Sequence, residues 1–293
     1  MLPPLDPARA FGRDPARLCR HKYRRTDVTA SLRENCADIL CIGAQKASTS
    51  WLHHVLNAHP RTYSFPDSEP VTSTTKEAHF WDWNHKRGAD WYRALLLPDD
   101  DPTRLSMDFT PEYSMMSERD IAECKELNPT ARVIYVLRDP LARAISALRM
   151  HILWRSGNAA ESELEIAFDD ALLSLIETAR IAEMSSYMAN YLRWAKQYDD
   201  ILVLNYEDIV AAPLRVMRQI YQHVGLSVDH MPPVARAEFD KRMQKRIWAS
   251  TPYPVRADVL YFLHGMLWPK RQAAERFFKM TFKEYEDVLR AAI

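Results

Sequence analysis

The chain has 293 residues, and its 39 lysines and arginines are balanced by 39 aspartates and glutamates. A formal net charge of zero provides no overall positive field for nucleic acid or an anionic membrane, so any anion site has to be local. The four cysteines lack metal-ligand spacing, which indicates reduced structural thiols. Because no long apolar run or secretion signal is evident, we expect a cytoplasmic protein without a membrane partner.

The distribution of proline and apolar residues predicts the domain organisation. Residues 1–35 are rich in proline and arginine and have little apolar periodicity, so we expect an irregular N-terminal arm. Residues 36–293 exceed the usual size of one core, but a single α/β domain with insertions accommodates them. Short apolar runs at 39–42, 131–137 and 201–204 alternate with helical patterns, which predicts a parallel sheet.

The first candidate site follows the strand expected at 39–42. Gly43 and Lys46 lead into Ser48 and Thr49, which can cap a helix that carries Trp51. Free backbone N–H groups at such a helix start, together with a lysine, favour a phosphate or a sulfate. The loop differs from GxxxxGK[ST], because no second glycine precedes the lysine. An ordinary strand-to-helix turn remains an alternative for the isolated motif.

The segment KEAHFWD at 76–82 mixes ionisable and aromatic residues. At strand spacing, Glu77 and His79 lie on the same side and face one pocket. A carboxylate held against aromatic rings is expected to have a raised pKa, which suits a general base that deprotonates a hydroxyl. Considered alone, the pair is better interpreted as a surface glutamate beside a structural histidine.

A second anion site is expected after the strand at 131–137. Arg138 follows this strand, Asp139 can cap the next helix, and Arg143 and Ser146 share one helix face. An arginine fork and a serine hydroxyl together recognise a phosphate with a defined orientation. A solvated helix face is the alternative for Arg143. Arg138 is the stronger candidate, because ligands of open parallel sheets bind at the carboxyl ends of strands.

Other segments are expected to be mainly structural. A short strand is predicted at 62–65, and helices are predicted at 91–97, 121–127, 213–224 and 270–292. The helical pattern at 161–198 has apolar stripes that include Phe168 and Leu192 and are expected to be mostly core. The basic residues at 241–246 near Trp248 are either a nucleotide clamp or a solvated helix face. Three histidines are expected at helix surfaces and turns rather than as metal ligands: His53, His54 and His59.

Several of these stretches together resemble the sulfotransferases that use 3'-phosphoadenosine 5'-phosphosulfate (PAPS), especially the branch with heparan sulfate sulfotransferases and bacterial relatives. GAQKASTSWL is similar to the family's 5'-phosphosulfate loop, VIYVLRDPLARAISAL to its 3'-phosphate motif, and KEAHFWD to the catalytic segment of that branch. MDFTPEY and YMANYLRWAKQY resemble two further blocks. The likeness covers roughly residues 37–226, and the motifs occur in the family's order.

The resemblance implies a P-loop-like, three-layer α/β/α fold with a central parallel sheet. It implies transfer of a sulfuryl group from PAPS, leaving the desulfated nucleotide PAP, with Glu77 as the base, His79 lining the site and Lys46 stabilising the leaving group. No metal is expected, and the acceptor is a hydroxyl of a small molecule or a carbohydrate. The donor-binding residues implied are Gly43, Gln45, Lys46, Ala47, Ser48, Thr49, Ser50, Trp51, Arg138 and Ser146.

Two departures from the branch are visible. A lysine of the glycosaminoglycan enzymes is replaced by Phe109, and their disulfide-bearing C-terminal part has no counterpart. A soluble bacterial-type enzyme is therefore favoured. The alternatives are a kinase or other nucleotide-hydrolysing enzyme, which requires magnesium and ATP, and a non-catalytic module that binds PAP or a sulfated glycan. No nucleic-acid partner is expected.

Overall fold

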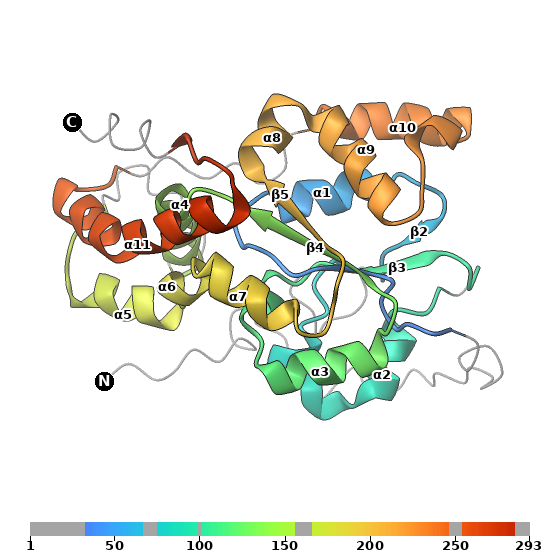
Figure 1. Cartoon of the computed structure of the whole chain (residues 1–293), viewed down its shortest axis with the longest axis horizontal. Helices are drawn as coiled ribbons and strands as arrows, with labels where there is room; N and C mark the ends of the chain where they lie inside the picture. Colours follow the sequence, from blue (N-terminus) through green and yellow to red (C-terminus); the bar gives the residue numbers. More distant parts are fainter. Residues whose placement is uncertain (1–32, 67–74, 99–100, 156–165, 246–253, 285–293) are drawn as a thin grey trace.

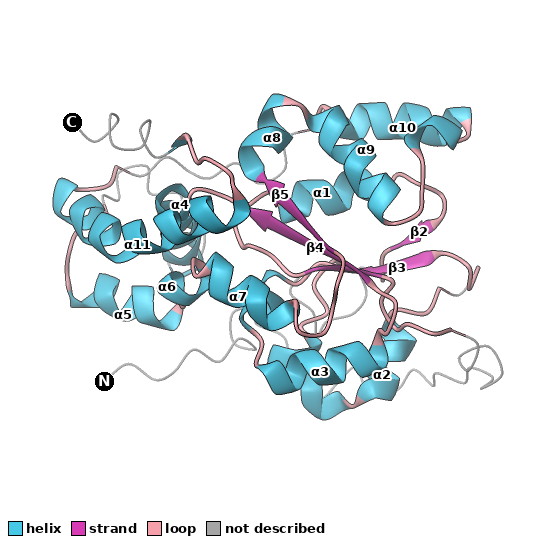
Figure 2. Cartoon of the chain, in the orientation of Figure 1, coloured by secondary structure: helices cyan, strands magenta, loops and turns pink. Residues whose placement is uncertain are grey.

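The computed structural model describes residues 33–66, 75–98, 101–155, 166–245 and 254–284. Within these ranges, a five-stranded sheet has the order β2-β3-β1-β4-β5, and every neighbouring pair is parallel (Figures 1 and 2). The central strand β1 is fully buried and its neighbour β4 is buried except at Arg132, as expected of a sheet covered on both faces. The strands are β1 (Ile39–Cys41), β2 (Thr62–Tyr63), β3 (Leu105–Asp108), β4 (Arg132–Leu137) and β5 (Ile201–Asn205).

Helices cover both faces of the sheet and the carboxyl ends of β4 and β5 (Figure 2). On one face α1 packs with α9 and α10, and on the other α3 packs with α7. The helix α4 begins directly after β4 and packs with α11. The bounds are α1 Thr49–Leu56, α2 Ala89–Leu95, α3 Glu118–Leu127, α4 Pro140–Arg155, α5 Asp170–Thr178, α6 Ile181–Met184, α7 Tyr187–Trp194, α8 Tyr206–Ala211, α9 Pro213–His223, α10 Pro233–Met243 and α11 Ala257–Phe278.

The observed architecture confirms the P-loop-like α/β fold with a central parallel sheet. Each of the three apolar runs forms a strand; β1 and β4 are buried between the helical layers, whereas β5, at the end of the strand order, is mostly half-buried. The strand order places β1 between β3 and β4. Because these three neighbouring strands are parallel, the segments that follow them lie together at the carboxyl ends of the strands, where the candidate site residues are found.

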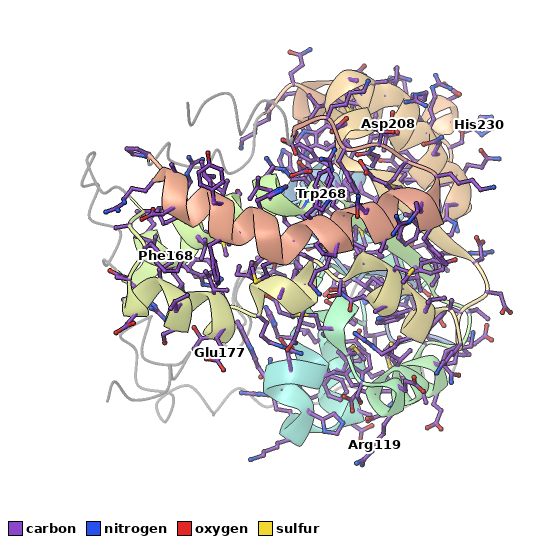
Figure 3. The ribbon with its side chains drawn as sticks, turned by 60° about the vertical axis from the view of Figure 1, so that its left-hand side comes forward. Arg119, Phe168, Glu177, Asp208, His230 and Trp268 are labelled. Atoms are coloured by element: carbon purple, nitrogen blue, oxygen red, sulfur yellow. The ribbon has the colours of Figure 1, made fainter. Side chains whose placement is uncertain are left out.

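Several local expectations were wrong. The last described long helix is α11, which begins at Ala257 rather than at 270, and residues 285–292 of the expected helix lie outside the described residues. The stripes at 161–198 are mostly core, as expected, with Leu172, Leu175 and Trp194 buried, but Phe168 and Leu192 are exposed. Phe168 packs edge-on against Phe262 of α11 at the surface (Figure 3). A periodic stripe does not by itself show which residues another element covers.

Two further expectations fall partly outside the described ranges. Of the basic cluster near Trp248, Arg242 on α10 binds Glu238 and the backbone oxygen of His54, while Arg246 and Trp248 lie outside the described residues. Three cysteines are buried free thiols, as expected, and Cys19 lies outside the described residues, as do residues 1–32 of the expected N-terminal arm. No helix in the described ranges is both long enough and apolar enough to span a bilayer.

Candidate active site

The loop after β1 is held against β4 by backbone hydrogen bonds. The Val136 N–H donates to the Gly43 oxygen at 2.7 Å, and the Ala44 N–H donates to the Val136 oxygen at 2.8 Å. Lys46 and Ser48 adopt positive φ angles of 67° and 68° before α1 begins at Thr49. Ser48 occupies the N-cap position, but its side chain makes no capping hydrogen bond, so the expected hydroxyl cap is absent at this residue.

Gly43 is required by both its conformation and its surroundings. Its φ is 130°, and a Cβ atom at this position would lie 2.8 Å from the backbone oxygen of Pro111. Gly43→Ala is therefore expected to lower the free energy of unfolding by more than about 1 kcal/mol, measured by urea denaturation. Gly225→Ala is the matched control, because Gly225 has a φ of 72° and open space around it. An equal loss in both variants would show that the contact with Pro111 is unimportant.

Arg138, at the end of β4, contacts the loop that follows β1. Its Nη1 donates to the backbone oxygen of Lys46 at 2.8 Å, and its guanidinium lies over the Tyr206 ring. Burial, and secondarily the charge of Arg138, lowers the pKa of Lys46. The two segments predicted separately as anion sites are thus brought together, and a doubly charged anion would relieve the repulsion between their cations.

The partners of Arg138 include a carboxylate that sequence reasoning missed. Glu284, 146 residues further along the chain, accepts hydrogen bonds from Nε and Nη2 of Arg138 at 2.8 and 2.9 Å. This two-point contact is the geometry in which an arginine fork also binds a phosphate. A glutamate after the last long helix carries no local signal for such a pairing.

Arg143 and Ser146, the other two residues of the second motif, are both buried in α4. Arg143 is 0% exposed and donates to Ser185 Oγ and to the Ile181 backbone oxygen, so neither a second anion site nor a solvated face describes it. Its guanidinium instead connects α4 to α6. Ser146 lies in the second turn of α4 and is only 4% exposed. All of the first nine residues of the helix are buried, which the sequence period alone does not reveal.

The segment with Glu77 brings together the two titratable groups that the sequence singled out. His79 Nε2 lies 3.4 Å from Glu77 Oε2, and His79 Nδ1 lies 2.7 Å from Asp82 Oδ2. The segment is not a regular strand: His79 has a φ of 48° and precedes a short π-helical turn, Phe80–Asn84. That turn places Trp83 parallel to His79, with ring centroids 3.5 Å apart.

The electrostatics of this cluster differ from the expectation. Burial acts to raise the pKa of Glu77, but the Lys76 ammonium and then His79 outweigh it and hold the pKa well below its usual range. Burial alone would lower the pKa of His79, whereas hydrogen bonds with Asp82 and Glu77 raise it to about 10. The expected rise in the pKa of Glu77 is therefore wrong, because cations and not only aromatic rings face the carboxylate.

His79 is expected to make folding stability depend on pH. Its pKa is about 10 in the folded protein against 6.5 ordinarily, so the stabilisation is full below pH 6.5 and is lost as the pH rises through 10. Urea denaturation at pH 6 and pH 9.5 is the measurement. The destabilisation caused by His79→Gln should be larger at pH 6, with His230→Gln, on the surface, as the control. If His79→Gln destabilised the protein equally at both pH values, the result would contradict a charged His79.

Lys76 supplies a cation close to Phe109, the position where the glycosaminoglycan branch has a lysine. Its Nζ donates to the Phe109 backbone oxygen at 3.2 Å and pairs with Glu77. The Phe109 side chain is buried and packs edge-on against the His53 ring. His53 is thus a core residue rather than the expected surface residue. His59 is also buried.

Asp108, at the end of β3, holds the Glu77 segment in place. One carboxylate oxygen accepts from the Ala78 N–H at 3.2 Å and from Thr110 Oγ1 at 2.7 Å. The other accepts from the hydroxyls of Tyr92 and Tyr113 at 2.9 and 3.0 Å. A carboxylate with four donors is rigidly oriented, so Asp108 acts as a structural support that the sequence reasoning did not identify.

Glu112 connects the loop after β1 to the Glu77 cluster. Its Oε1 accepts a hydrogen bond from Gln45 Nε2 at 3.0 Å, and burial raises its pKa to about 7 although His79 opposes this. Glu112 was also not identified from the sequence, where only the surrounding MDFTPEY block was noted.

His79, Asp82 and Glu112 also form a cluster whose ligand atoms lie within 4.8 Å of one another. Within this cluster, His79 Nδ1 lies 2.7 Å from Asp82 Oδ2, so these two side chains pair with each other.

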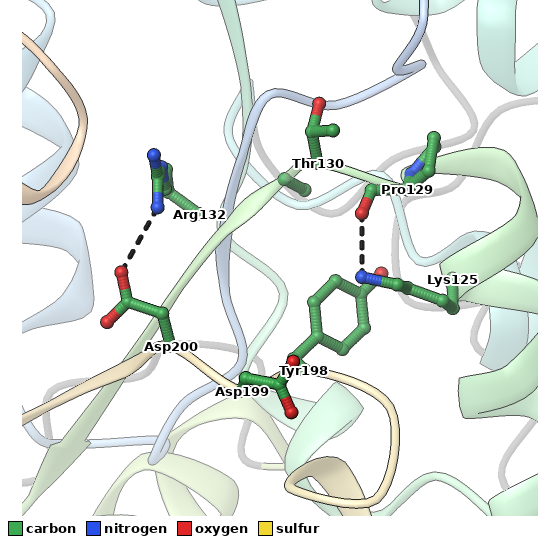
Figure 4. A pocket seen from close by; sticks show the side chains of 8 residues that line it. Lys125, Pro129, Thr130, Arg132, Tyr198, Asp199 and Asp200 are labelled. Carbon is green, nitrogen blue, oxygen red and sulfur yellow. Dashed lines mark hydrogen bonds and ion pairs between the residues drawn. The ribbon is translucent and has the colours of Figure 1, made fainter.

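A separate pocket lies at the amino ends of β4 and β5, at the opposite end of the sheet from the strand ends that carry the candidate site (Figure 4). Three of its charged groups have partners within the chain: Arg132 pairs with Asp200 at 3.1 Å, and Lys125 donates to the Pro129 oxygen. It lies where β4 begins, whereas Arg138 and the loop after β1 follow the strand ends. This pocket is therefore not part of the candidate site.

Comparison with known proteins identifies the family of this chain. Residues 37–250 match the sulfotransferase domain family. The chain is a sulfotransferase family member. The structure of a sulfotransferase from Alicyclobacillus acidocaldarius has a TM-score of 0.59 and 19% identity, and the match covers 85% of this chain and 98% of that one. Such a match shows the shared fold.

Curated sequence relatives include the mouse heparan sulfate glucosamine 3-O-sulfotransferases 3B1 and 3A1. Each is 27% identical over 190 residues, which is 64% of this sulfotransferase and 45% of the relative. This chain thus spans less than half the length of these relatives.

Proposed function

We propose that this sulfotransferase transfers a sulfuryl group from PAPS to a hydroxyl of a small-molecule or carbohydrate acceptor. The observation that carries the proposal is the position of Glu77, which contacts Lys76 and His79, while Glu112, which lies near His79, accepts a hydrogen bond from Gln45 of the loop after β1. Family membership supports the reaction class.

In the proposed mechanism, Glu77 takes the proton of the acceptor hydroxyl while that oxygen attacks sulfur in line and the bond from sulfur to the phosphate oxygen breaks. A carboxylate with a low pKa can act here, because the hydroxyl becomes strongly acidic as its oxygen bonds to sulfur. The Lys46 ammonium stabilises the charge that develops on the departing phosphate oxygen. The Lys76 ammonium and then His79, held as an imidazolium by Asp82, keep Glu77 ionised and oriented.

We assign donor binding to the segments that follow the carboxyl ends of β1 and β4. The loop residues Gly43 to Ser48 and the first turn of α1, which contains Thr49, Ser50 and Trp51, are proposed to hold the 5'-phosphate through backbone N–H groups and hydroxyls. Arg138 and Ser146 are proposed to hold the 3'-phosphate. Contact between Arg138 and the Lys46 backbone supports a single site for both phosphates.

Trp83 is a candidate for contact with the acceptor. One face of its ring covers His79, yet 47% of the residue remains exposed. An exposed indole beside the base can stack against a sugar or phenol ring.

We therefore expect Trp83→Ala to raise the KM for a ring-bearing acceptor about tenfold, with a smaller effect on the KM for PAPS. Steady-state kinetics with both substrates varied is the measurement, and Trp154→Ala, another exposed tryptophan, is the control. A loss confined to kcat would instead indicate that Trp83 only positions His79.

The proposed activity can be tested with a panel of sugars, phenols and aliphatic alcohols incubated with PAPS and analysed by mass spectrometry. A gain of one sulfuryl group that depends on PAPS supports the proposal. Binding of PAP without transfer to any acceptor would favour a non-catalytic module. Magnesium-dependent ATP hydrolysis, with ATP bound more tightly than PAP, would favour a kinase-like enzyme.

A further inference from the structure

The Arg138 guanidinium, which is proposed to bind the 3'-phosphate, is already paired with a carboxylate of the same chain. Glu284 engages Nε and Nη2 of Arg138 at 2.8 and 2.9 Å, while Nη1 is directed to the Lys46 backbone oxygen at 2.8 Å. All three nitrogens of the fork are therefore used within the chain. A phosphate approaching the same two-point edge of Arg138 has to displace the carboxylate.

The segment that carries Glu284 is attached to the sheet edge through several contacts. The carboxylate of Glu207, just after β5, accepts from the backbone N–H groups of Lys283 and Glu284. Phe282 is buried, and its N–H donates to Glu275 Oε1 at 3.1 Å. Asn205 donates to the Thr281 oxygen at 3.1 Å. These contacts hold Glu284 close to Arg138, so its carboxylate is present at a high effective concentration.

We infer that Glu284 is a specificity-determining residue of the donor site, because its carboxylate competes with the 3'-phosphate of the nucleotide for Arg138. The inference rests on the proposed function, which assigns the 3'-phosphate to Arg138. A nucleotide that lacks this phosphate leaves the pair between Arg138 and Glu284 intact. Glu284 thus reduces the preference of the site for 3'-phosphorylated nucleotides and weakens retention of the product PAP.

Isothermal titration of PAP and of adenosine 5'-monophosphate tests this inference, since the two ligands differ only in the 3'-phosphate. Glu284→Gln keeps the size of the side chain and removes its charge. We expect it to bind PAP about tenfold more tightly than the unmodified protein, with the affinity for the monophosphate unchanged. Glu118→Gln, which removes a surface partner of Lys196, changes the net charge equally and is the control.

Glu207→Gln is a second variant, because it weakens the attachment of the segment and leaves Glu284 in place. It should shift PAP affinity in the same direction, and thermal unfolding verifies that both variants are folded. Equal PAP affinity in the unmodified protein and both variants would overturn the inference and leave PAPS as the donor. If none of the proteins binds PAP more tightly than the monophosphate, the assignment of the 3'-phosphate to Arg138 fails, and the inference fails with it.

Discussion

Replacing Glu77 with glutamine is expected to lower kcat by about a hundred- to ten-thousand-fold, the usual contribution of a general base. Glutamine has nearly the same size but cannot accept the hydroxyl proton. Because Glu77 is proposed to act on the acceptor and not on the nucleotide, the affinity for PAP should be retained. Single-turnover kinetics and calorimetric titration of PAP measure the two effects separately.

The control for this variant is Glu123→Gln, which removes a carboxylate that pairs with His85 at the surface. It should leave kcat unchanged. The pH dependence is a further check: since the pKa of Glu77 lies well below its usual range, the kcat of the unmodified enzyme should not fall on acidification until below the ordinary carboxylate range. Near-full turnover by Glu77→Gln would refute the assignment of the base.

Replacing Lys46 with methionine is expected to lower kcat by about a hundred- to a thousand-fold, as does the loss of one charge-stabilising donor in other enzymes. Methionine preserves much of the side-chain volume, so the loop conformation with its positive φ at residue 46 should persist. Because negative charge on the leaving phosphate oxygen grows only during transfer, kcat should fall more than PAP affinity does.

Lys125→Met is the matched control, because Lys125 lies in the pocket at the opposite ends of the strands (Figure 4). Its kcat should equal that of the unmodified enzyme. If Lys46→Met raised the KM for PAPS without changing kcat, Lys46 would contribute to ground-state binding alone, and its proposed role in leaving-group departure would be wrong.

Local sequence features were sufficient to locate three strands of the sheet and the loop of the first motif. Buried strands consist of consecutive apolar residues, and β1, β4 and β5 were located in this way to within one residue. The spacing of Glu77 and His79 also indicated that both face one site, although the backbone there is a turn and not a strand. The pKa of Glu77 was misjudged, because the adjacent Lys76 folds back onto the carboxylate.

The stretch from Ala37 to Trp51 determined by itself where a strand ends and where the loop before the next helix begins, since a run of apolar residues and the helix-start residues that follow it are properties of neighbouring positions. Only the tertiary structure decided that Arg143 is buried and that Arg138 meets both Lys46 and Glu284. Burial and ion pairing join residues as far as 146 positions apart, and they depend on which strands become neighbours in the sheet. No local pattern records that proximity, so the competition for Arg138 becomes visible only in the folded chain.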